Sequence, residues 1–163
     1  DIGKGLVPAA LFPPLVGVEF PWGFLFGLAA IGGHMFSFWV GFKGGKGMAT
    51  GAGVLLALAP TAVLIGFILW FCVTIGSGYV SLASILVAMA MPLIIALTPH
   101  QGGVELVWLS SGLAAFIVWK HRTNVRRLIR GEENRFRRTS RDENRQSVTP
   151  DTSIDVNTPG DQL

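Results

Sequence analysis

The stretch Met48–Ile75, MATGAGVLLALAPTAVLIGFILWFCVTI, decides the fold of this chain. It contains no charged residue, and it is too long for one untilted helix across the roughly 30 Å hydrocarbon core of a bilayer. Pro60 falls near its middle, and proline breaks helices because it lacks an N–H and clashes with the preceding turn. The stretch is therefore either one tilted span or two shorter ones.

The rest of the chain has the composition of an integral membrane protein. Half of its 163 residues are apolar, only 14% are charged, and the mean hydropathy is +0.52. This composition excludes an ordinary soluble domain. Ten of the thirteen basic residues lie between Lys120 and Arg145. Nucleic-acid binding is disfavoured because no folded basic face with interleaved aromatic residues is evident. The single cysteine, Cys72, cannot form an internal disulfide.

Hydropathy windows of about 19 residues predict four further spans. The first is short or kinked because it contains three prolines, and a turn at Thr98–Gly103 precedes the last. The four spans are Gly5–Val18, Trp22–Val40, Tyr79–Leu97 and Val104–Trp119.

Charge then decides the number of crossings. Basic loops of membrane proteins face the cytoplasm, so the Lys43/Lys46 loop and the arginine-rich tail should share one face. An even number of spans must then separate them, and splitting Met48–Ile75 at Pro60 gives four. We therefore predict an all-α polytopic helical bundle with six membrane segments over residues 1–130. Residues 131–163 are predicted to be a disordered, initially basic cytoplasmic tail. An odd count, with loop and tail on opposite faces, is the alternative.

The loop itself lies in Gly32–Thr50, GGHMFSFWVGFKGGKGMAT, and has the features of an anion site. Glycines let backbone N–H groups turn toward an anion, and two lysines add positive charge. A nucleotide-binding P-loop is excluded, since three residues rather than four separate the first Gly from the Gly-Lys pair and Gly47 replaces Ser or Thr. A flexible positive loop that only fixes topology is the alternative.

Two other clusters are candidates. Lys120–Glu133, KHRTNVRRLIRGEE, reads as a juxtamembrane polybasic anchor, yet an anchor needs neither His121 nor Asn124. At i and i+3 these two share a helix face, where they could handle a proton and orient a hydroxyl. Ser81 and Ser84 either permit close helix packing or line a substrate cavity.

The motifs resemble a known family. Gly32–Thr50 resembles the second signature of the bacterial acyl-phosphate:glycerol-3-phosphate acyltransferases (the PlsY family), roughly G-H-x-F-P-x-x-x-x-F-x-G-G-K-G-V-A-T. HRTNVRRLIRGEE resembles its closing signature, H-R-x-N-I-x-R-L-x-x-G-x-E. DIGKGLVP and VSLAS are similar to segments of the same family, so the resemblance covers about residues 1–133.

Two departures stand out. Ser37 occupies a position where the family usually has Pro. The family's first signature, a Gly-Ser-x-Asn-x-Gly-Ala-Thr-Asn loop, would precede Asp1. We therefore expect an N-terminally truncated chain that shows six of the seven helices of the intact family fold.

The resemblance implies transfer of a fatty acyl group from acyl phosphate to the 1-hydroxyl of glycerol 3-phosphate, giving lysophosphatidic acid and phosphate in phospholipid synthesis. It implies no cofactor and no metal. Catalytic roles fall on Lys46, His121 and Asn124, and a structural role, with an arginine as its partner, falls on Glu133. Whether His121 acts as a base stays open, because a substrate phosphate could take the proton. Substrate binding is implied for His34, Lys43, Gly44, Gly45, Lys46, Gly47, Ser81, Ser84 and Arg122.

The implied partners are acyl phosphate, glycerol 3-phosphate, the lipid bilayer and an enzyme that produces acyl phosphate. The implied location is the bacterial inner membrane, as a multi-pass protein with its site loops and tail in the cytoplasm. The alternatives are a non-catalytic anion-binding protein or transporter, and an inactive fragment of the enzyme.

Overall fold

The computed structural model describes residues 1–37, 41 and 44–136. Over these residues the chain forms seven α-helices and no strand, which confirms the predicted helical class. The predicted tail lies mostly outside the described residues. The helices are α1 (Ile2–Val16), α2 (Trp22–Met35), α3 (Met48–Leu58), α4 (Pro60–Ser77), α5 (Val80–Ala96), α6 (Gly103–Lys120) and α7 (Arg122–Arg130).

The chain breaks at Pro60, as predicted. α3 ends at Leu58, Ala59 leaves the helical region with φ −146° and ψ 65°, and Pro60 opens α4. Proline suits a first helical position because its missing N–H would have no partner within the helix there. α3 and α4 are therefore two helices joined by a single residue, which gives the even count of segments that the charges require.

Some helix ends differ from the predicted ones. α1 begins at Ile2 rather than Gly5, and α2 ends at Met35 rather than Val40. Hydropathy registers apolar side chains and not backbone conformation, so the window extended α2 into the apolar residues beyond its Phe36 cap. Residues 38–40 of that predicted span lie outside the described part of the chain.

The apolar helices differ in whether they are long enough to cross a bilayer. By length and composition, α4 and α6 are long and apolar enough to cross a membrane, whereas α1, α2, α3 and α5 are shorter apolar helices. Leu64, Phe67 and Ile68 of α4 are each more than half exposed. Such a continuous apolar surface suits hydrocarbon rather than water.

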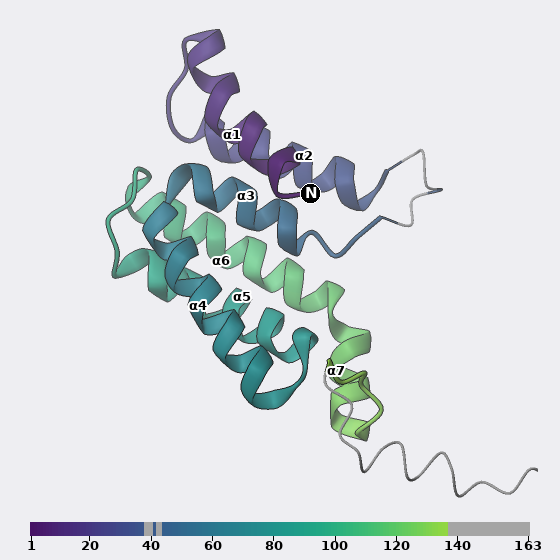
Figure 1. Ribbon diagram of the computed structural model, residues 1–163. Helices are drawn as coiled ribbons and strands as arrows, with labels where there is room; N and C mark the ends of the chain where they lie inside the picture. The colour runs from purple at the N-terminus through teal and green to yellow at the C-terminus, as the bar shows by residue number, and fades with distance from the viewer. Residues whose placement is uncertain (38–40, 42–43, 137–163) are drawn as a thin grey trace, which may run out of the picture.

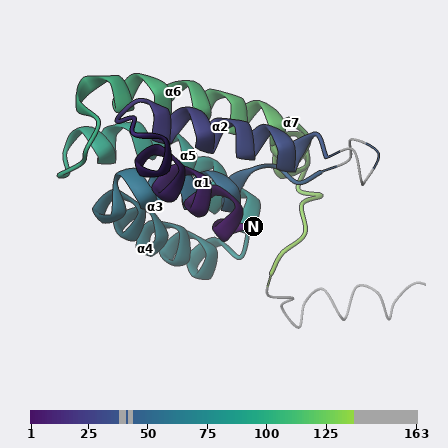
Figure 2. The same ribbon diagram turned by 90° about the horizontal axis from the view of Figure 1, so that it is seen from above.

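The helices form two groups (Figures 1 and 2). α1 packs against α2 and α3, while α5 packs against α4 and α6. The groups meet around a core that includes the fully buried Ile31, Val54, Ile95 and Leu106.

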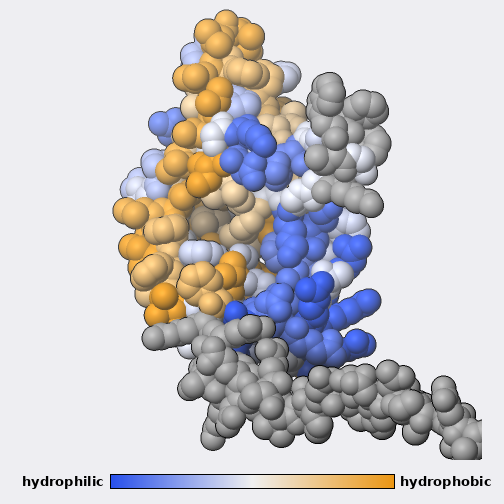
Figure 3. Space-filling model, turned by 45° about the vertical axis from the view of Figure 1, so that its right-hand side comes forward, coloured by the Kyte–Doolittle hydropathy of each residue, from blue (hydrophilic) through white to orange (hydrophobic). Residues whose placement is uncertain are grey.

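One end of the bundle collects the polar connections. The Lys46 Nζ atom lies 2.6 Å from Asn124 Oδ1, and the Phe136 amide donates to the Gly78 carbonyl at 2.6 Å. The segment before α3, the α4–α5 turn and the α6–α7 junction therefore lie together. Hydrophilic side chains gather in the lower right of Figure 3, whereas hydrophobic ones cover its top and left. The glycine–lysine loop and the closing segment thus share one end.

α1 and α3 cross at unusually close range. A Cβ atom on Gly5 would collide with the Thr50 carbonyl oxygen, and one on Gly53 would collide with the Ile2 carbonyl oxygen. Glycine permits this approach, as small residues do in membrane helix packing. The crossing holds the first residues of α1 beside the start of α3, at the polar end.

The substitution Gly53→Ala tests this crossing. Because the new methyl group would meet backbone rather than a movable side chain, we expect a loss of about 1–3 kcal/mol in stability. Gly51→Ala is the matched control in the same helix, since its Cβ would lie 3.7 Å from Ile117 Cδ1 and Leu113 Cδ2, an ordinary contact. The midpoint of thermal unfolding in detergent should fall for the first variant only. Equal midpoints would contradict the close crossing.

Candidate active site

A polar cavity of about 510 Å³ opens at this end of the bundle. It brings together residues from six parts of the chain: the residue before α1, the end of α2, the start of α3, the start of α5, the α6–α7 junction and the segment after α7. Its lining includes His34, Lys46, Gly47, Ser81, Ser84, His121, Asn124 and Glu133. Eight residues predicted from the sequence are therefore neighbours in space.

A hydrogen-bonded series orders the cavity. Lys46 Nζ donates to Asn124 Oδ1 at 2.6 Å, and Asn124 Nδ2 donates to Glu133 Oε1 at 2.6 Å. An ammonium only donates and a carboxylate only accepts, so the two partners fix which way the amide points. The Lys46 ammonium keeps two N–H donors that have no partner among the described residues. These donors can serve an anion.

His121 ends α6 as its C-cap and is 3% exposed. Its Nδ1 atom lies 2.8 Å from the Ile117 carbonyl oxygen. Since a carbonyl only accepts, Nδ1 carries the proton, and Nε2 holds the lone pair in the neutral ring. Burial lowers the pKa of His121, the hydrogen bond to Ile117 and the charge of Glu133 oppose this, and the charge of Lys46 adds to it. The ring is therefore neutral at pH 7.

Glu133 keeps its charge. Burial alone would raise its pKa, but the hydrogen bond from Asn124 and the positive charges of Arg127 and Lys46 outweigh burial, so the pKa lies below the usual range. Ser81 Oγ and Glu133 Oε2 have no hydrogen bond among the described residues. Within this part of the chain, Glu133 therefore binds Asn124, and Arg127 acts on it through its charge.

The glycines of the loop occupy different positions relative to the cavity. Gly44 and Gly45 do not line the cavity; they lie against His34, whose Nε2 would be 2.6 Å from a Cβ on Gly45. Gly47 is the N-cap of α3, with φ 78°. Since no side chain caps α3, its first N–H groups are available to an anion at the positive end of the helix dipole.

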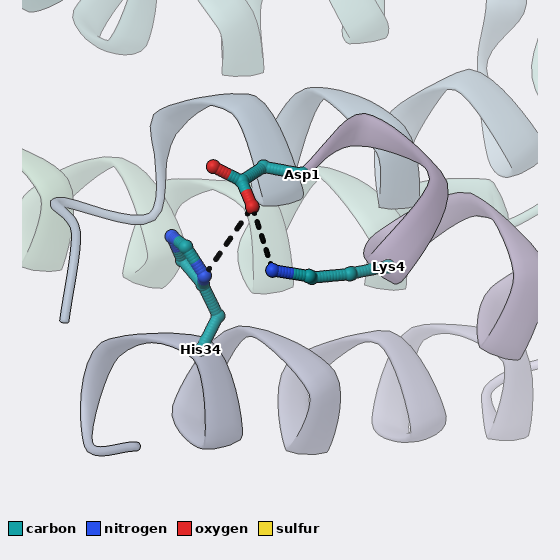
Figure 4. Close-up of polar contacts among 3 residues, drawn as sticks. All are labelled: Asp1, Lys4 and His34. Atoms are coloured by element: carbon teal, nitrogen blue, oxygen red, sulfur yellow. Dashed lines mark hydrogen bonds and ion pairs between the residues drawn. The ribbon is translucent and has the colours of Figure 1, made fainter. Parts of the chain in front are cut away.

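Asp1 and Lys4 extend the site in a way that the motifs did not indicate. The Asp1 carboxylate lies 2.9 Å from Lys4 Nζ and 3.7 Å from His34 Nδ1 (Figure 4). Asp1 also lines the cavity. The packing of α1 against α2 brings Asp1 to His34, and no spacing along the sequence signals that pair.

The two serines differ in what they can offer. Ser81 Oγ is buried and has no hydrogen-bond partner among the described residues. Ser84 Oγ donates its proton to the Val80 carbonyl at 2.9 Å and accepts from Trp70 Nε1 at 3.2 Å. Ser84 therefore offers no free proton, whereas Ser81 does.

Arg122, which the closing motif predicted as a binding residue, lies elsewhere. Arg122 does not line the cavity: its guanidinium lies 4.5 Å from the centre of the Trp119 ring, and Nη1 donates to the Trp119 carbonyl at 3.3 Å. α7 begins at Arg122 and points this side chain away from Asn124. Lys43 lies outside the described residues.

An apolar groove of about 580 Å³ adjoins the polar cavity. Ile2 of α1 and helices α3 to α6 line it, and Met48, Ala49 and Ser84 line both spaces. A polar compartment thus lies next to a hydrophobic one. Among the described residues, no group of three or more His, Cys, Asp or Glu side chains is placed to hold a metal ion.

The fold and the site define a class: a helical membrane protein with a polar cavity, lined by both basic and acidic side chains, next to an apolar groove. The family model described as glycerol-3-phosphate acyltransferase matches residues 1–131, and the chain belongs to this family.

Glycerol-3-phosphate acyltransferases from Geobacter sulfurreducens and Aquifex aeolicus are 42% and 36% identical to it over 137 residues each. These alignments cover 84% and 83% of this chain and 69% and 70% of the relatives.

Two crystal structures are similar to the whole bundle. Both are of PlsY (YgiH), an integral membrane glycerol 3-phosphate acyltransferase, one in a glycerol 3-phosphate form and one in a lysophosphatidic acid form. Their TM-scores are 0.76 and 0.75 at 35% identity, covering 84% and 83% of this chain and 68% of that protein. The predicted family, membrane fold and acyltransferase class are confirmed.

The electrostatic balance around His121 can be measured. We expect the pKa of His121 to lie below the ordinary value of about 6.5, to fall further in Glu133→Gln and to rise in Lys46→Gln. A carboxylate stabilises the imidazolium and an ammonium destabilises it, which gives the two shifts opposite signs. NMR titration of the histidine rings reports these values, and His121→Gln identifies the signal among three histidines. A rise of the pKa in Glu133→Gln would contradict this arrangement.

Proposed function

We propose that this chain transfers a fatty acyl group from acyl phosphate to the 1-hydroxyl of glycerol 3-phosphate, releasing phosphate and forming lysophosphatidic acid. The observation that carries this proposal is that the polar cavity, which holds Lys46, adjoins the apolar groove at Met48, Ala49 and Ser84. A donor with a charged head and a hydrocarbon chain requires two such compartments side by side. The crystallised relative's glycerol 3-phosphate and lysophosphatidic acid forms support the acceptor and the product.

Phosphate recognition falls to the start of α3. Lys46 supplies a positive charge with two donors left over, and the uncapped N–H groups after Gly47 supply further donors. A helix N-terminus next to an ammonium favours a phosphate group. Ser81 adds a buried hydroxyl. His34 lies next to the Asp1 carboxylate and packs against Gly44 and Gly45.

The reaction needs positioning more than a covalent intermediate. The acceptor hydroxyl oxygen bonds to the carbonyl carbon, the bond from that carbon to the phosphate oxygen breaks, and phosphate leaves with the electron pair. Phosphate is a good leaving group, so the protein's tasks are alignment and neutralisation of charge. Lys46 neutralises phosphate, and Asn124 with His121 orients the reacting groups. The hydroxyl proton passes to a substrate phosphate or to His121 Nε2.

The apolar groove would hold the acyl chain while the head group reaches Lys46. With this assignment the acyl chain never leaves a hydrocarbon environment, which avoids the cost of exposing it to water. The polar end then faces the cytoplasm of a bacterial inner membrane, in keeping with its arginines and lysines. An enzyme that makes acyl phosphate would supply the donor from that side.

Lys46→Ala tests the phosphate site. We expect kcat/KM for glycerol 3-phosphate to fall at least about tenfold, because a charge-assisted hydrogen bond is lost. Lysophosphatidic acid formed by the purified protein in micelles is the measurement. Lys120→Ala, a lysine at the same end that does not line the cavity, is the control. An unchanged KM and kcat in Lys46→Ala removes Lys46 from the site, and no product from the unaltered protein favours an anion-binding or transport function.

Ala52→Leu tests the acyl groove. Ala52 lines the groove on α3, so a larger side chain should exclude part of a long acyl chain. We expect KM for a long-chain acyl phosphate to rise roughly tenfold, with a smaller change for a short-chain donor and none for glycerol 3-phosphate. Ala29→Leu, on an exposed position of α2, should change none of these. The same effect on long and short donors would contradict the assignment.

A further inference from the structure

The six residues Gly131–Phe136, here called the C-terminal strap, fold back from α7 onto the turn between α4 and α5. Gly131 ends α7 with φ 70°, and its amide donates to the Leu128 carbonyl at 3.1 Å. The left-handed conformation of this glycine reverses the chain, which then runs beside α7 (yellow-green in Figure 1). The family model ends its match at residue 131. Residues 132–136 of the strap therefore lie past the range of the family model, although Glu133 still belongs to the closing motif of the sequence.

Two hydrogen bonds fasten the end of the strap. The Phe136 amide donates to the Gly78 carbonyl at 2.6 Å, and Arg135 Nε donates to the Tyr79 hydroxyl at 2.8 Å. The Arg135 guanidinium also lies 5.1 Å from the centre of the Tyr79 ring, within the range of a cation–π interaction.

The turn that receives the strap is itself well ordered by local bonds. Gly78 caps α4 in the left-handed conformation, and Ser77 Oγ accepts from the Tyr79 amide at 3.1 Å while it donates to the Val73 carbonyl at 2.6 Å. These bonds hold the backbone of the α4–α5 turn at Tyr79.

The strap carries Glu133, two residues before Arg135. Glu133 Oε1 accepts from Asn124 Nδ2, and Asn124 Oδ1 accepts from Lys46 Nζ. The backbone of the strap joins Arg135 to Glu133, so hydrogen bonds and this short stretch of chain together connect Tyr79 to Asn124 and Lys46. Tyr79 itself does not line the cavity.

We propose that Tyr79 and Arg135 are positioning residues for Lys46. By holding the strap on the α4–α5 turn, they fix the Glu133 carboxylate; the carboxylate fixes the Asn124 amide, and the amide directs the ammonium of Lys46 into the cavity. Lysine has a long side chain with much rotamer freedom to lose. An ordered acceptor therefore determines where the ammonium group lies. This inference rests on the proposed function, in which Lys46 binds a substrate phosphate.

Tyr79→Phe is the sharpest test, because it removes one hydroxyl and keeps the ring under the guanidinium. We expect KM for glycerol 3-phosphate to rise about threefold to tenfold, the effect of one net hydrogen bond, with kcat nearly unchanged, as for lost uniform binding. In a Glu133→Gln background the same substitution should add nothing, since its effect passes through Glu133. Ser111→Ala, which removes a hydroxyl bonded to the Val107 carbonyl in α6, is the control and should leave KM unchanged.

A double-mutant cycle separates positioning from general stability. The proposal would be overturned if Tyr79→Phe raised KM for glycerol 3-phosphate by the same factor in the unaltered protein and in Glu133→Gln. It would also be overturned if the substitution changed KM in neither. Titration of His121 gives a readout that needs no activity. Lys46 and Glu133 are the charged groups that act on His121, so loosening the strap should lower the His121 pKa as Glu133→Gln does, and should not lower it further in the double variant. If the unaltered protein makes no product, the proposed function fails while this titration still decides the strap.

Discussion

The Asn124 amide, held between a lysine and a glutamate, is the interaction on which the arrangement of the chain depends. Its partners lie 78 residues before it and 9 residues after it, so three segments must meet for it to form. Lys46 precedes α3, while Asn124 follows α6, and their meeting requires the chain between them to leave this end of the bundle and return an even number of times. The break at Pro60 supplies the crossing that makes the count even. The helix break at Pro60 and the long-range contact between Lys46 and Asn124 therefore require the same topology.

α3 joins the two chemical environments. Its N-terminus borders the polar cavity, and its side lines the apolar groove, within a helix of 11 residues. The glycines on α1 and α3 let these helices cross without intervening side chains, and Ile2 at the start of α1 lines the groove together with α3. The space between α3 and the group of α4, α5 and α6 remains open. In the proposed site, a hydrocarbon chain can therefore lie in the apolar groove while a phosphate lies next to it in the polar cavity.

Much of this could be read from the sequence, and the missing parts share a physical reason. Pro60, the Gly78 break and the clustering of Lys46, His121 and Asn124 follow from backbone chemistry, charge and helical spacing. The Asp1–His34 pair, the Trp70–Ser84 bond and the strap on Tyr79 depend on how helices rotate and cross, which hydropathy does not encode. Arg122 shows the same limit: it is adjacent to His121 in sequence, yet the start of α7 turns its side chain onto Trp119.

The amide between Lys46 and Glu133 also explains how an acidic residue can stand in a site for anions. A direct ion pair would occupy the lysine donors and cancel its charge at short range, because Coulomb energy scales inversely with distance. Asn124 accepts only one N–H of the ammonium and passes its own N–H to the carboxylate, so the negative charge is moved one side chain away. In the proposed site, two N–H donors of Lys46 are left for a substrate phosphate, while Glu133 orients the amide to which Lys46 is bound. The neutral amide of Asn124 thus orients the Lys46 ammonium without using up the donors that can bind an anion.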